Sequence, residues 1–303
     1  MPWKLCERIA SLGKLSCMKI SLRIGLTALS LGIVASSNAW VNTGHMIVNA
    51  IAYSQLTPNA RQAVGDILKA ETEPQFANFL SLATWADAHK TKRNGPWHYK
   101  DIFFRADGGH TDLHADDENA IWAIQTFVPL LSEVGATRSE KLTALRFITH
   151  IVGDIHQPLH ATARVTSAHP NGDRGGNDFA IKPISGMSTR GDVKNLHLYW
   201  DFACGDYSDC SPDLSSADRA YIEGKAKAYM KEFPRAAFTL VMKPKLYESW
   251  LQESFFLAKT QVYKLTENAS IPQEYEKSGR RLCRQRIALA GYRLADILNR
   301  AFK

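Results

Sequence analysis

The chain of 303 residues contains few cysteines, and it has neither a low-complexity tract nor an internal repeat. Its hydrophobic fraction of 45% and charged fraction of 22% are ordinary for a globular protein, which excludes disordered and fibrous classes. No Cys-x2-Cys pair occurs, so a zinc–thiolate site is disfavoured. An apolar run from Ile24 to Ala35 is shorter than the roughly 20 residues that span a bilayer, which disfavours a transmembrane anchor.

The first 39 residues have the pattern of a cleavable secretion signal. Basic residues precede the apolar run, and the small residues Ser37 and Ala39 stand at positions −3 and −1 of the expected cleavage site. Residues 1–17 form an upstream extension, because Met18 alone would begin a normal signal. We therefore expect a secreted or periplasmic protein whose mature chain, residues 40–303, is one domain without stable membrane anchoring.

Cleavage also changes the charge and the cysteine count. The formal net charge of +7 includes five basic residues and one acidic residue of the leader, so the mature chain carries +3. This mild basicity is compatible with a phosphate-bearing substrate. Two of the five cysteines leave with the leader. Cys204 and Cys210 flank a short loop and could form a local disulfide, or Cys283 pairs with one of them; the sequence leaves the pairing open.

Apolar residues recur at helical spacing through most of the mature chain and predict a mainly α, single-domain fold. One helix is expected to begin at a cap formed by Thr137 or Ser139 and to run into residues 147–160. The other expected helices span residues 43–56, 58–68, 116–133, 215–233, 245–266 and 272–301. Residues 165–195 are rich in Gly, Asn and Asp and predict a loop with at most a small β-hairpin.

The most informative stretch, residues 147–160, places His150 and Asp154 four residues apart, on one face of a helix. His160 follows just after a proline that must end or kink that helix. His197 and Asp201 repeat the His-x3-Asp spacing. One such pair is often a simple intrahelical contact, but two pairs with a further histidine close behind one of them favour metal binding.

Eight residues form the candidate ligand set: His45, Asp87, His98, His150, Asp154, His160, His197 and Asp201. Five imidazoles and three carboxylates are too many for one tetrahedral zinc ion, and they suit two or three ions with a bridging carboxylate. Nitrogen and oxygen ligands with prominent imidazole favour zinc over calcium or magnesium. His156 lies only two residues from Asp154, so we expect it to point elsewhere and to have a structural role.

These motifs make the chain resemble the S1/P1 nuclease family from Trp40 to Asp201. The matching motifs are Gly44-His45, Trp85-Ala-Asp87, Trp97-His98, His150-Ile-Val-Gly-Asp154-Ile-His-Gln-Pro-Leu-His160, Gly175-Gly-Asn177 and Asn195-Leu-His197-Leu-Tyr-Trp-Asp201. The resemblance implies a helical phospholipase C/P1 nuclease-like fold. Bacterial zinc phospholipase C shares that fold but ends its ligand pattern with His-x3-Glu, whereas this chain has His197 and Asp201, which favours the nuclease branch.

The resemblance also implies three zinc ions. Their ligands would be Asp87, His98, His150 and Asp154 for the first; Trp40, His45 and Asp154 for the second; and His160, His197 and Asp201 for the third. Trp40 would bind through its α-amino group and carbonyl oxygen, so signal cleavage would complete the site. Asp101 and Asp154 are implied as catalytic residues, and Tyr99, Asp101 and Asn177 as substrate-binding residues.

The activity that follows is hydrolysis of single-stranded DNA and RNA to 5′-nucleotides, with 3′-nucleotidase activity, by a monomeric secreted enzyme. A hydroxide between two zinc ions would attack phosphorus, and the third ion would stabilise the departing 3′-oxygen. Asp101 would orient water or substrate, and Tyr99 would stack on a base. Two alternatives are a zinc-dependent phospholipase C and a non-catalytic, zinc-stabilised helical binding protein.

Overall fold

The computed structural model describes residues 40–242 and 247–303. All of them belong to one compact unit, residues 37–303. The expected secretion signal and its cleavage site after Ala39 lie outside the described residues. Within the described part, none of the helices combines the length and the apolar character that crossing a bilayer requires.

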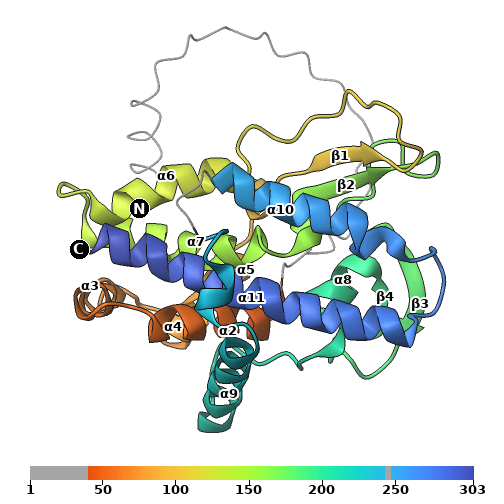
Figure 1. The fold of residues 1–303 in the computed structure, drawn as a ribbon. Helices are drawn as coiled ribbons and strands as arrows, with labels where there is room; N and C mark the ends of the chain where they lie inside the picture. The colour runs from red at the N-terminus through yellow and green to blue at the C-terminus, as the bar shows by residue number, and fades with distance from the viewer. Residues whose placement is uncertain (1–39, 243–246) are drawn as a thin grey trace, which may run out of the picture. The chain divides into compact units, whose positions relative to one another are not determined.

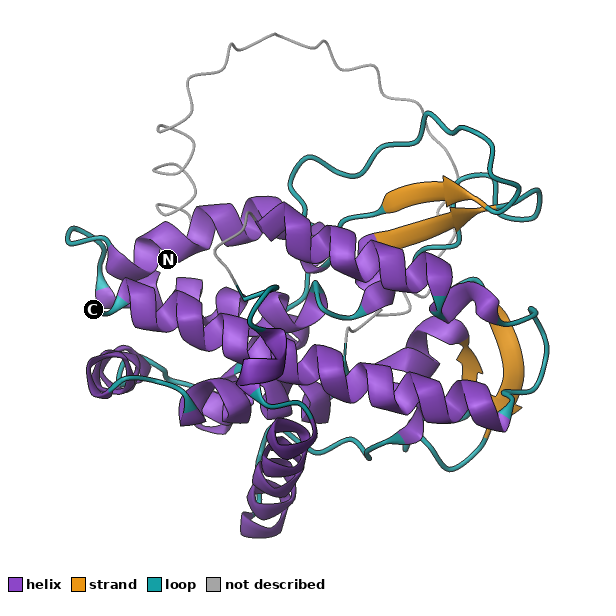
Figure 2. Cartoon of the chain, viewed as in Figure 1, coloured by secondary structure: helices purple, strands orange, loops and turns teal. Residues whose placement is uncertain are grey.

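The fold is mainly α, as the sequence predicts (Figure 2). The α-helices of the described residues are α2 (Asn42–Ser54), α3 (Pro58–Leu68), α4 (Phe79–Leu82), α5 (Trp85–Ala88), α6 (Ala120–Ser132), α7 (Arg138–Asp154), α8 (Leu196–Asp201), α9 (Ser216–Glu232), α10 (Tyr247–Thr260) and α11 (Gln273–Ala301). Short 3₁₀ turns connect them: η1 (Pro74–Phe76), η2 (Gly95–His98), η3 (Pro158–Ala161), η4 (Ala203–Gly205), η5 (Arg235–Phe238) and η6 (Val262–Lys264).

Two short strand pairs accompany the helices. Strands β3 (Ala180–Ile184) and β4 (Val193–Asn195) pair antiparallel, which confirms the expected hairpin. Strands β1 (Ile102–Arg105) and β2 (Thr162–Val165) pair in parallel, with Ile102 opposite Thr162. This second pair was not predicted, because it joins two four-residue segments that lie 60 residues apart in the chain.

Capping residues fix where the helices begin. Thr57 accepts a hydrogen bond from the Ala60 amide, so α3 begins at residue 58, the predicted start. Thr137, rather than Ser139, caps α7. The predicted start of α6 at residue 116 is wrong. The Asn119 side chain caps α6 through two backbone amides of its first turn and also donates to the carbonyl of Asp116, which holds the preceding residues in a turn.

Helix α11 packs along α2 and also contacts α7 (Figure 1). Gly291 allows the close approach to α2, because a Cβ atom there would lie 2.6 Å from side-chain atoms of Ile51. The last half of α7 is fully buried. Helix α10 packs against η3, which follows α7 in the chain. The core helices therefore surround the end of α7, where the candidate ligands converge.

Candidate metal centre

Separate elements bring the candidate ligands to one buried region. The eight residues come from α2 (His45), α5 (Asp87), η2 (His98), α7 (His150 and Asp154), η3 (His160) and α8 (His197 and Asp201). All are buried except Asp87, whose side chain is still only 7% exposed. We call these eight residues the ligand cluster. Side chains of these types fall into three groups that could hold a metal ion.

The first group joins α5, η2 and α7. His98 Nδ1 lies 3.5 Å from Asp87 Oδ1, 3.2 Å from Asp154 Oδ2 and 3.0 Å from His150 Nε2. His150 Nε2 in turn lies 3.6 Å from Asp87 and 3.3 Å from Asp154. Ligand atoms about 2.0–2.2 Å from a tetrahedral zinc ion lie roughly 3.3–3.6 Å apart. These four side chains therefore have the spacing of one zinc coordination shell.

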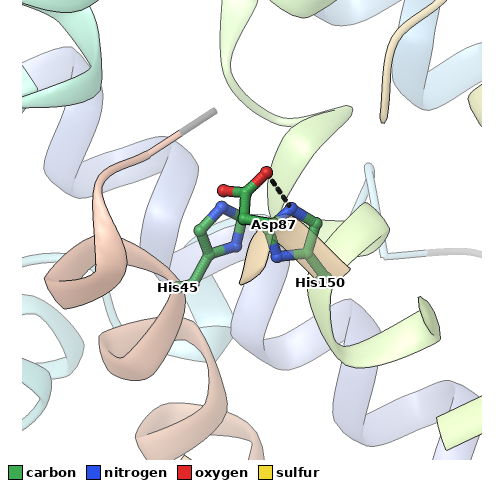
Figure 3. Close-up of side chains that lie close together, drawn as sticks. All are labelled: His45, Asp87 and His150. Carbon is green, nitrogen blue, oxygen red and sulfur yellow. Dashed lines mark ion pairs between the residues drawn. The ribbon is translucent and has the colours of Figure 1, made fainter. Parts of the chain in front are cut away.

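Asp154 presents a different oxygen to each of two neighbours. Its Oδ2 faces His98 and His150, whereas its Oδ1 lies 3.3 Å from Nε2 of His45. The rings of His45 and His150 stack with centroids 3.9 Å apart, and Asp87 reaches the same place (Figure 3). A carboxylate with one oxygen toward each of two ligand groups can bridge two metal ions.

The remaining group joins η3 and α8. Nε2 of His160 and Nε2 of His197 lie 3.1 Å apart, and Oδ2 of Asp201 lies 3.6 Å from His197. Asp201 accepts a hydrogen bond from Gln157 on its other oxygen, Oδ1, at 2.8 Å. This leaves Oδ2 to face the two imidazoles. Three buried ligand atoms therefore meet in this group, and Asp154 is not one of its members.

Backbone carbonyls orient three of the imidazoles. Nδ1 of His150 lies 2.6 Å from the carbonyl of Ala83, Nδ1 of His160 lies 2.8 Å from that of His98, and Nδ1 of His197 lies 2.7 Å from that of Gly175. Each contact fixes a proton on Nδ1 and turns Nε2 toward the cluster. Metal-binding histidines are held in this way.

Unpartnered polar atoms provide a test of whether metal ions fit. Of the 13 buried side-chain nitrogen and oxygen atoms that lack a hydrogen-bond partner in the described residues, seven belong to the ligand cluster. They include both oxygens of Asp154, Oδ1 of Asp87 and Oδ2 of Asp201. An unpartnered buried carboxylate is costly unless a cation compensates it. The donor set therefore fits divalent cations.

The electrostatics of the site lead to the same conclusion. Burial holds the pKa of His45, His98 and His160 well below the usual range, so these imidazoles are neutral and can bind a metal at neutral pH. Burial raises the pKa of Asp154 and of Asp201 above the usual range. A buried carboxyl retains its proton where no cation offsets its charge, and a divalent ion would displace that proton.

Trp40, the expected N-terminal ligand, lies beside the cluster. Its buried indole donates from Nε1 to the carbonyl of Gly153 at 3.0 Å, one residue before Asp154. Gly44 makes room for it, since a Cβ atom there would lie 2.5 Å from Cβ of Trp40. A Cβ atom on Gly153 would lie 2.8 Å from Nδ1 of His45. Gly153 thus lets α7 approach His45 of α2 closely, and Gly44 leaves room for Trp40.

The expected substrate-binding residues lie outside the metal groups. Tyr99 and Asp101 are partly buried and stand between η2 and β1. Burial and the nearby carboxylates of Asp173 and Asp116 raise the pKa of Asp101 to about 7. Asn177 is partly buried and donates to the carbonyl of Arg174 at 2.8 Å. It follows the glycine pair whose carbonyls hold His197.

The structure separates one histidine from the cluster and adds one lysine. His156 points away from Asp154, as expected, and Nε2 of its ring lies 2.9 Å from Nη1 of Arg293.

Lys90 follows Asp87 by three residues. After burial, its positive charge is the next largest influence lowering the pKa of His98, so it lies within electrostatic reach of the ligands. The sequence analysis missed Lys90, although its position three residues after the Trp-Ala-Asp motif could have identified it as a neighbour of the ligands.

Comparison with known proteins shows that the sequence is similar to nucleases. The family model described as S1/P1 Nuclease matches residues 40–303. Nuclease S1 of Aspergillus oryzae is 32% identical over 196 residues, which cover 60% of this chain and 62% of that protein. Endonuclease 2 of Arabidopsis thaliana is 28% identical over 285 residues, or 88% of this chain and 91% of that protein. Nuclease P1 of Penicillium citrinum is 28% identical over 170 residues, and that alignment spans 57% of its length.

Proposed function

The chain belongs to the S1/P1 nuclease family, and on this premise we propose that it is a zinc-dependent nuclease. It cuts single-stranded DNA and RNA to 5′-nucleotides and removes 3′-phosphates from nucleotides. Export after cleavage near Ala39 yields the active chain, residues 40–303, as a monomer. The observation that carries the proposal is the Asp154 carboxylate, whose two unpartnered oxygens face two different sets of histidines.

We assign three zinc ions to the ligand cluster. The ligands are Asp87, His98, His150 and Asp154 for the first ion; Trp40, His45 and Asp154 for the second; and His160, His197 and Asp201 for the third. Zinc ions bound there would lower the pKa of water and offset the charge that develops on the phosphate and on the leaving oxygen. The protein supplies a buried frame, because backbone carbonyls orient His150, His160 and His197 and Gln157 orients Asp201.

The residues around the cluster receive the substrate. Asp101 orients the attacking water or the nucleotide, and a pKa of about 7 lets its carboxyl hold or release a proton near neutral pH. Lys90 contributes positive charge toward the phosphate. Tyr99 stacks on a base, and Asn177 offers polar contacts beside the third group of ligands.

The preference for single strands follows from the burial of the ligands. All ligand side chains lie within the fold rather than on its surface, so a phosphate must approach closely and bring its base with it. A base that is to stack on Tyr99 must be unpaired, and unstacking a duplex costs about a few kcal/mol. The mild positive charge of the mature chain attracts the backbone without selecting a sequence.

The N-terminus completes the second ion's ligand set. Trp40 is fully buried, and its indole is hydrogen-bonded to Gly153, the residue before Asp154. After cleavage, the free α-amino group of Trp40 would therefore lie close to His45 and Asp154. A chain that retains even one residue before Trp40 has an amide in place of that amine, and an amide nitrogen has no lone pair for a metal. Cleavage of the leader is therefore part of activation.

Metal analysis beside a digest of nucleic acids tests the proposal. The chain beginning at Trp40 should contain three zinc ions by inductively coupled plasma mass spectrometry. It should degrade single-stranded DNA and RNA faster than duplex DNA. A matched chain that retains Ala39 should lose one of the three ions and most of the activity.

The other outcomes separate the alternatives. A zinc-loaded chain that leaves every phosphodiester intact would be a binding protein. Turnover of phosphatidylcholine vesicles without cleavage of nucleic acid would identify a phospholipase C. A zinc-free chain with full nuclease activity would overturn the metal assignment.

A further inference from the structure

The segment directly after the last ligand has an unusual backbone. Asp201 ends α8, and the three residues of η4 all have positive φ angles: 48° at Ala203, 56° at Cys204 and 83° at Gly205. Two of the three carry a Cβ atom, for which the left-handed region is unfavourable. Such conformations persist where the surrounding structure holds them.

Helix α11 supplies the contacts that hold this segment. Arg280 donates from Nε to the carbonyl of Cys204 at 3.0 Å. The Cys204 side chain occupies a niche over Gly279, since a Cβ atom on that glycine would lie 2.6 Å from Sγ of Cys204. Cys283 follows Gly279 by one helical turn and lines the same niche. Its Sγ lies 4.0 Å from Sγ of Cys204, and both side chains are fully buried.

We propose that Cys204 and Cys283 form a disulfide that anchors the end of α8, and with it His197 and Asp201, to α11. The two thiols lose two protons and two electrons to an exogenous disulfide, such as glutathione disulfide, which leaves as two thiols. The sulfur atoms are in contact, and modest side-chain rotation brings them from 4.0 Å to the bond length of about 2.0 Å. Because both sulfurs are buried, an oxidant or a reductant reaches them only while the chain folds or unfolds.

Cys210 remains a thiol in this arrangement, and the local Cys204–Cys210 pairing is not used. Cys210 instead packs beside the first turn of α2. Its amide donates to Oγ1 of Thr43 at 2.8 Å, and its carbonyl accepts from Asn42 at 3.2 Å. These bonds fix the Cys210 backbone to α2, whereas Cys204 points to α11. The cross-link goes beyond the proposed function and depends on it only for delivery to an oxidising compartment.

Peptide mapping without reduction tests the pairing directly. The exported mature chain is unfolded in a denaturant that contains iodoacetamide, so that buried free thiols are also alkylated, and is then digested. A parallel sample is first refolded from the reduced state in a glutathione redox buffer and treated in the same way. Both samples should yield one linked peptide pair that contains Cys204 and Cys283 and disappears on reduction, with the alkyl group on Cys210. Alkylation of all three cysteines in both samples, or a Cys204–Cys210 link, would overturn the proposal.

Thermal unfolding with and without dithiothreitol provides a second measurement. The bond would close a loop between residues 79 apart in the sequence. For a chain of this length, we expect reduction to lower the midpoint of the parent protein by about 5–15 °C. Cys283→Ala and Cys204→Ala should show no effect of reductant, and the matched control Cys210→Ala should behave like the parent. A reductant effect that survives in Cys283→Ala, or is absent from the parent, contradicts the cross-link whether or not the protein is a nuclease.

Discussion

Asp154 and His156 stand two residues apart at the end of α7, yet they belong to buried clusters of opposite character. Asp154 is part of the ligand cluster. His156 is part of a second group, formed with Glu253, Ser254, Arg286 and Arg293, which we call the arginine cluster. Both clusters lie in the core, and their charged residues other than Glu253 are almost fully buried. The difference lies in their hydrogen bonds.

The arginine cluster satisfies nearly all of its own hydrogen-bonding groups. The two terminal nitrogens of Arg293, Nη1 and Nη2, donate to the two oxygens of Glu253 at 2.8 Å, and Arg286 contacts the same carboxylate at 3.2 Å. Arg286 also donates to Ser254 and to the carbonyl of His156. The one unpartnered atom of the arginine cluster is Nε of Arg293, whose guanidinium faces the ring of Trp250. The ligand cluster instead leaves both oxygens of its central carboxylate without partners. Buried groups that pair with each other stabilise the fold, and buried acceptors left unpaired are available to a ligand.

Replacing the central carboxylate is expected to have the largest effect. Asp154→Asn places an amide where two ions would share a carboxylate, so it should abolish the binding of two zinc ions. Nuclease activity should fall by more than about a hundredfold, since even the outer partners of metal ligands contribute roughly 10- to 100-fold. Metal content and initial rates on single-stranded DNA measure both effects.

The same variant tests the contrast between the clusters. Without metal, Asp154→Asn should be no less stable than the parent, because it removes an uncompensated buried carboxyl. The control is Asp112→Asn, whose side chain is 97% exposed and which should keep its zinc and its activity. Full activity in Asp154→Asn would show that the carboxylate does not bridge metal ions.

The reciprocal change breaks the satisfied cluster. Glu253→Gln leaves two buried guanidinium groups without their shared counter-charge, so the free energy of unfolding should fall by about 3–5 kcal/mol. Zinc content per folded molecule should stay the same, since no ligand is altered. Urea unfolding followed by circular dichroism measures the loss.

A neighbouring pair supplies the matched control for that change. Glu248 lies on the same helix, is 42% exposed and pairs with Lys100. Glu248→Gln should cost at most about 1 kcal/mol, as is usual for surface ion pairs. Equal losses in the two variants would mean that the arginine cluster contributes no more than an ordinary surface contact.

The two clusters also differ in how far the sequence could predict them. The spacing of His150 and Asp154 on one helix, and of His197 and Asp201 on another, predicted ligand faces, and the family resemblance predicted how they combine. The arginine cluster joins His156 to residues about 100–140 positions later, and no spacing links them. The parallel pair of β1 and β2 escaped prediction for the same reason. Local periodicity predicts helices and their faces, whereas contacts between distant segments are decided by packing.

Tyr99 belongs to neither cluster and tests the approach to the ligand cluster. If its ring stacks on an unpaired base, Tyr99→Ala should reduce kcat/KM on single-stranded DNA by about 1–3 kcal/mol of transition-state binding. Tyr99→Phe keeps the ring and should remain close to the parent. The backbone contact from the Ala120 amide to the Tyr99 carbonyl survives in both variants. Equal activity of the Ala and Phe variants would exclude stacking at this position.

Asp101 gives the smallest and most specific test, because it is a partly buried carboxyl that neither an arginine nor the ligand groups compensate. Burial, Asp173 and Asp116 raise its pKa to about 7, compared with roughly 3.9 in an unfolded chain. The folded protein therefore binds the proton more tightly, so the contribution of Asp101 is most favourable below pH 4 and is lost as the pH rises to 7. Asp101→Asn removes this loss, and its unfolding midpoint should exceed that of the parent by a few degrees at pH 8 and by less at pH 5. Differential scanning calorimetry of both proteins at the two pH values measures the change, and a difference that is as large at pH 5 would show that Asp101 is already compensated in the folded protein.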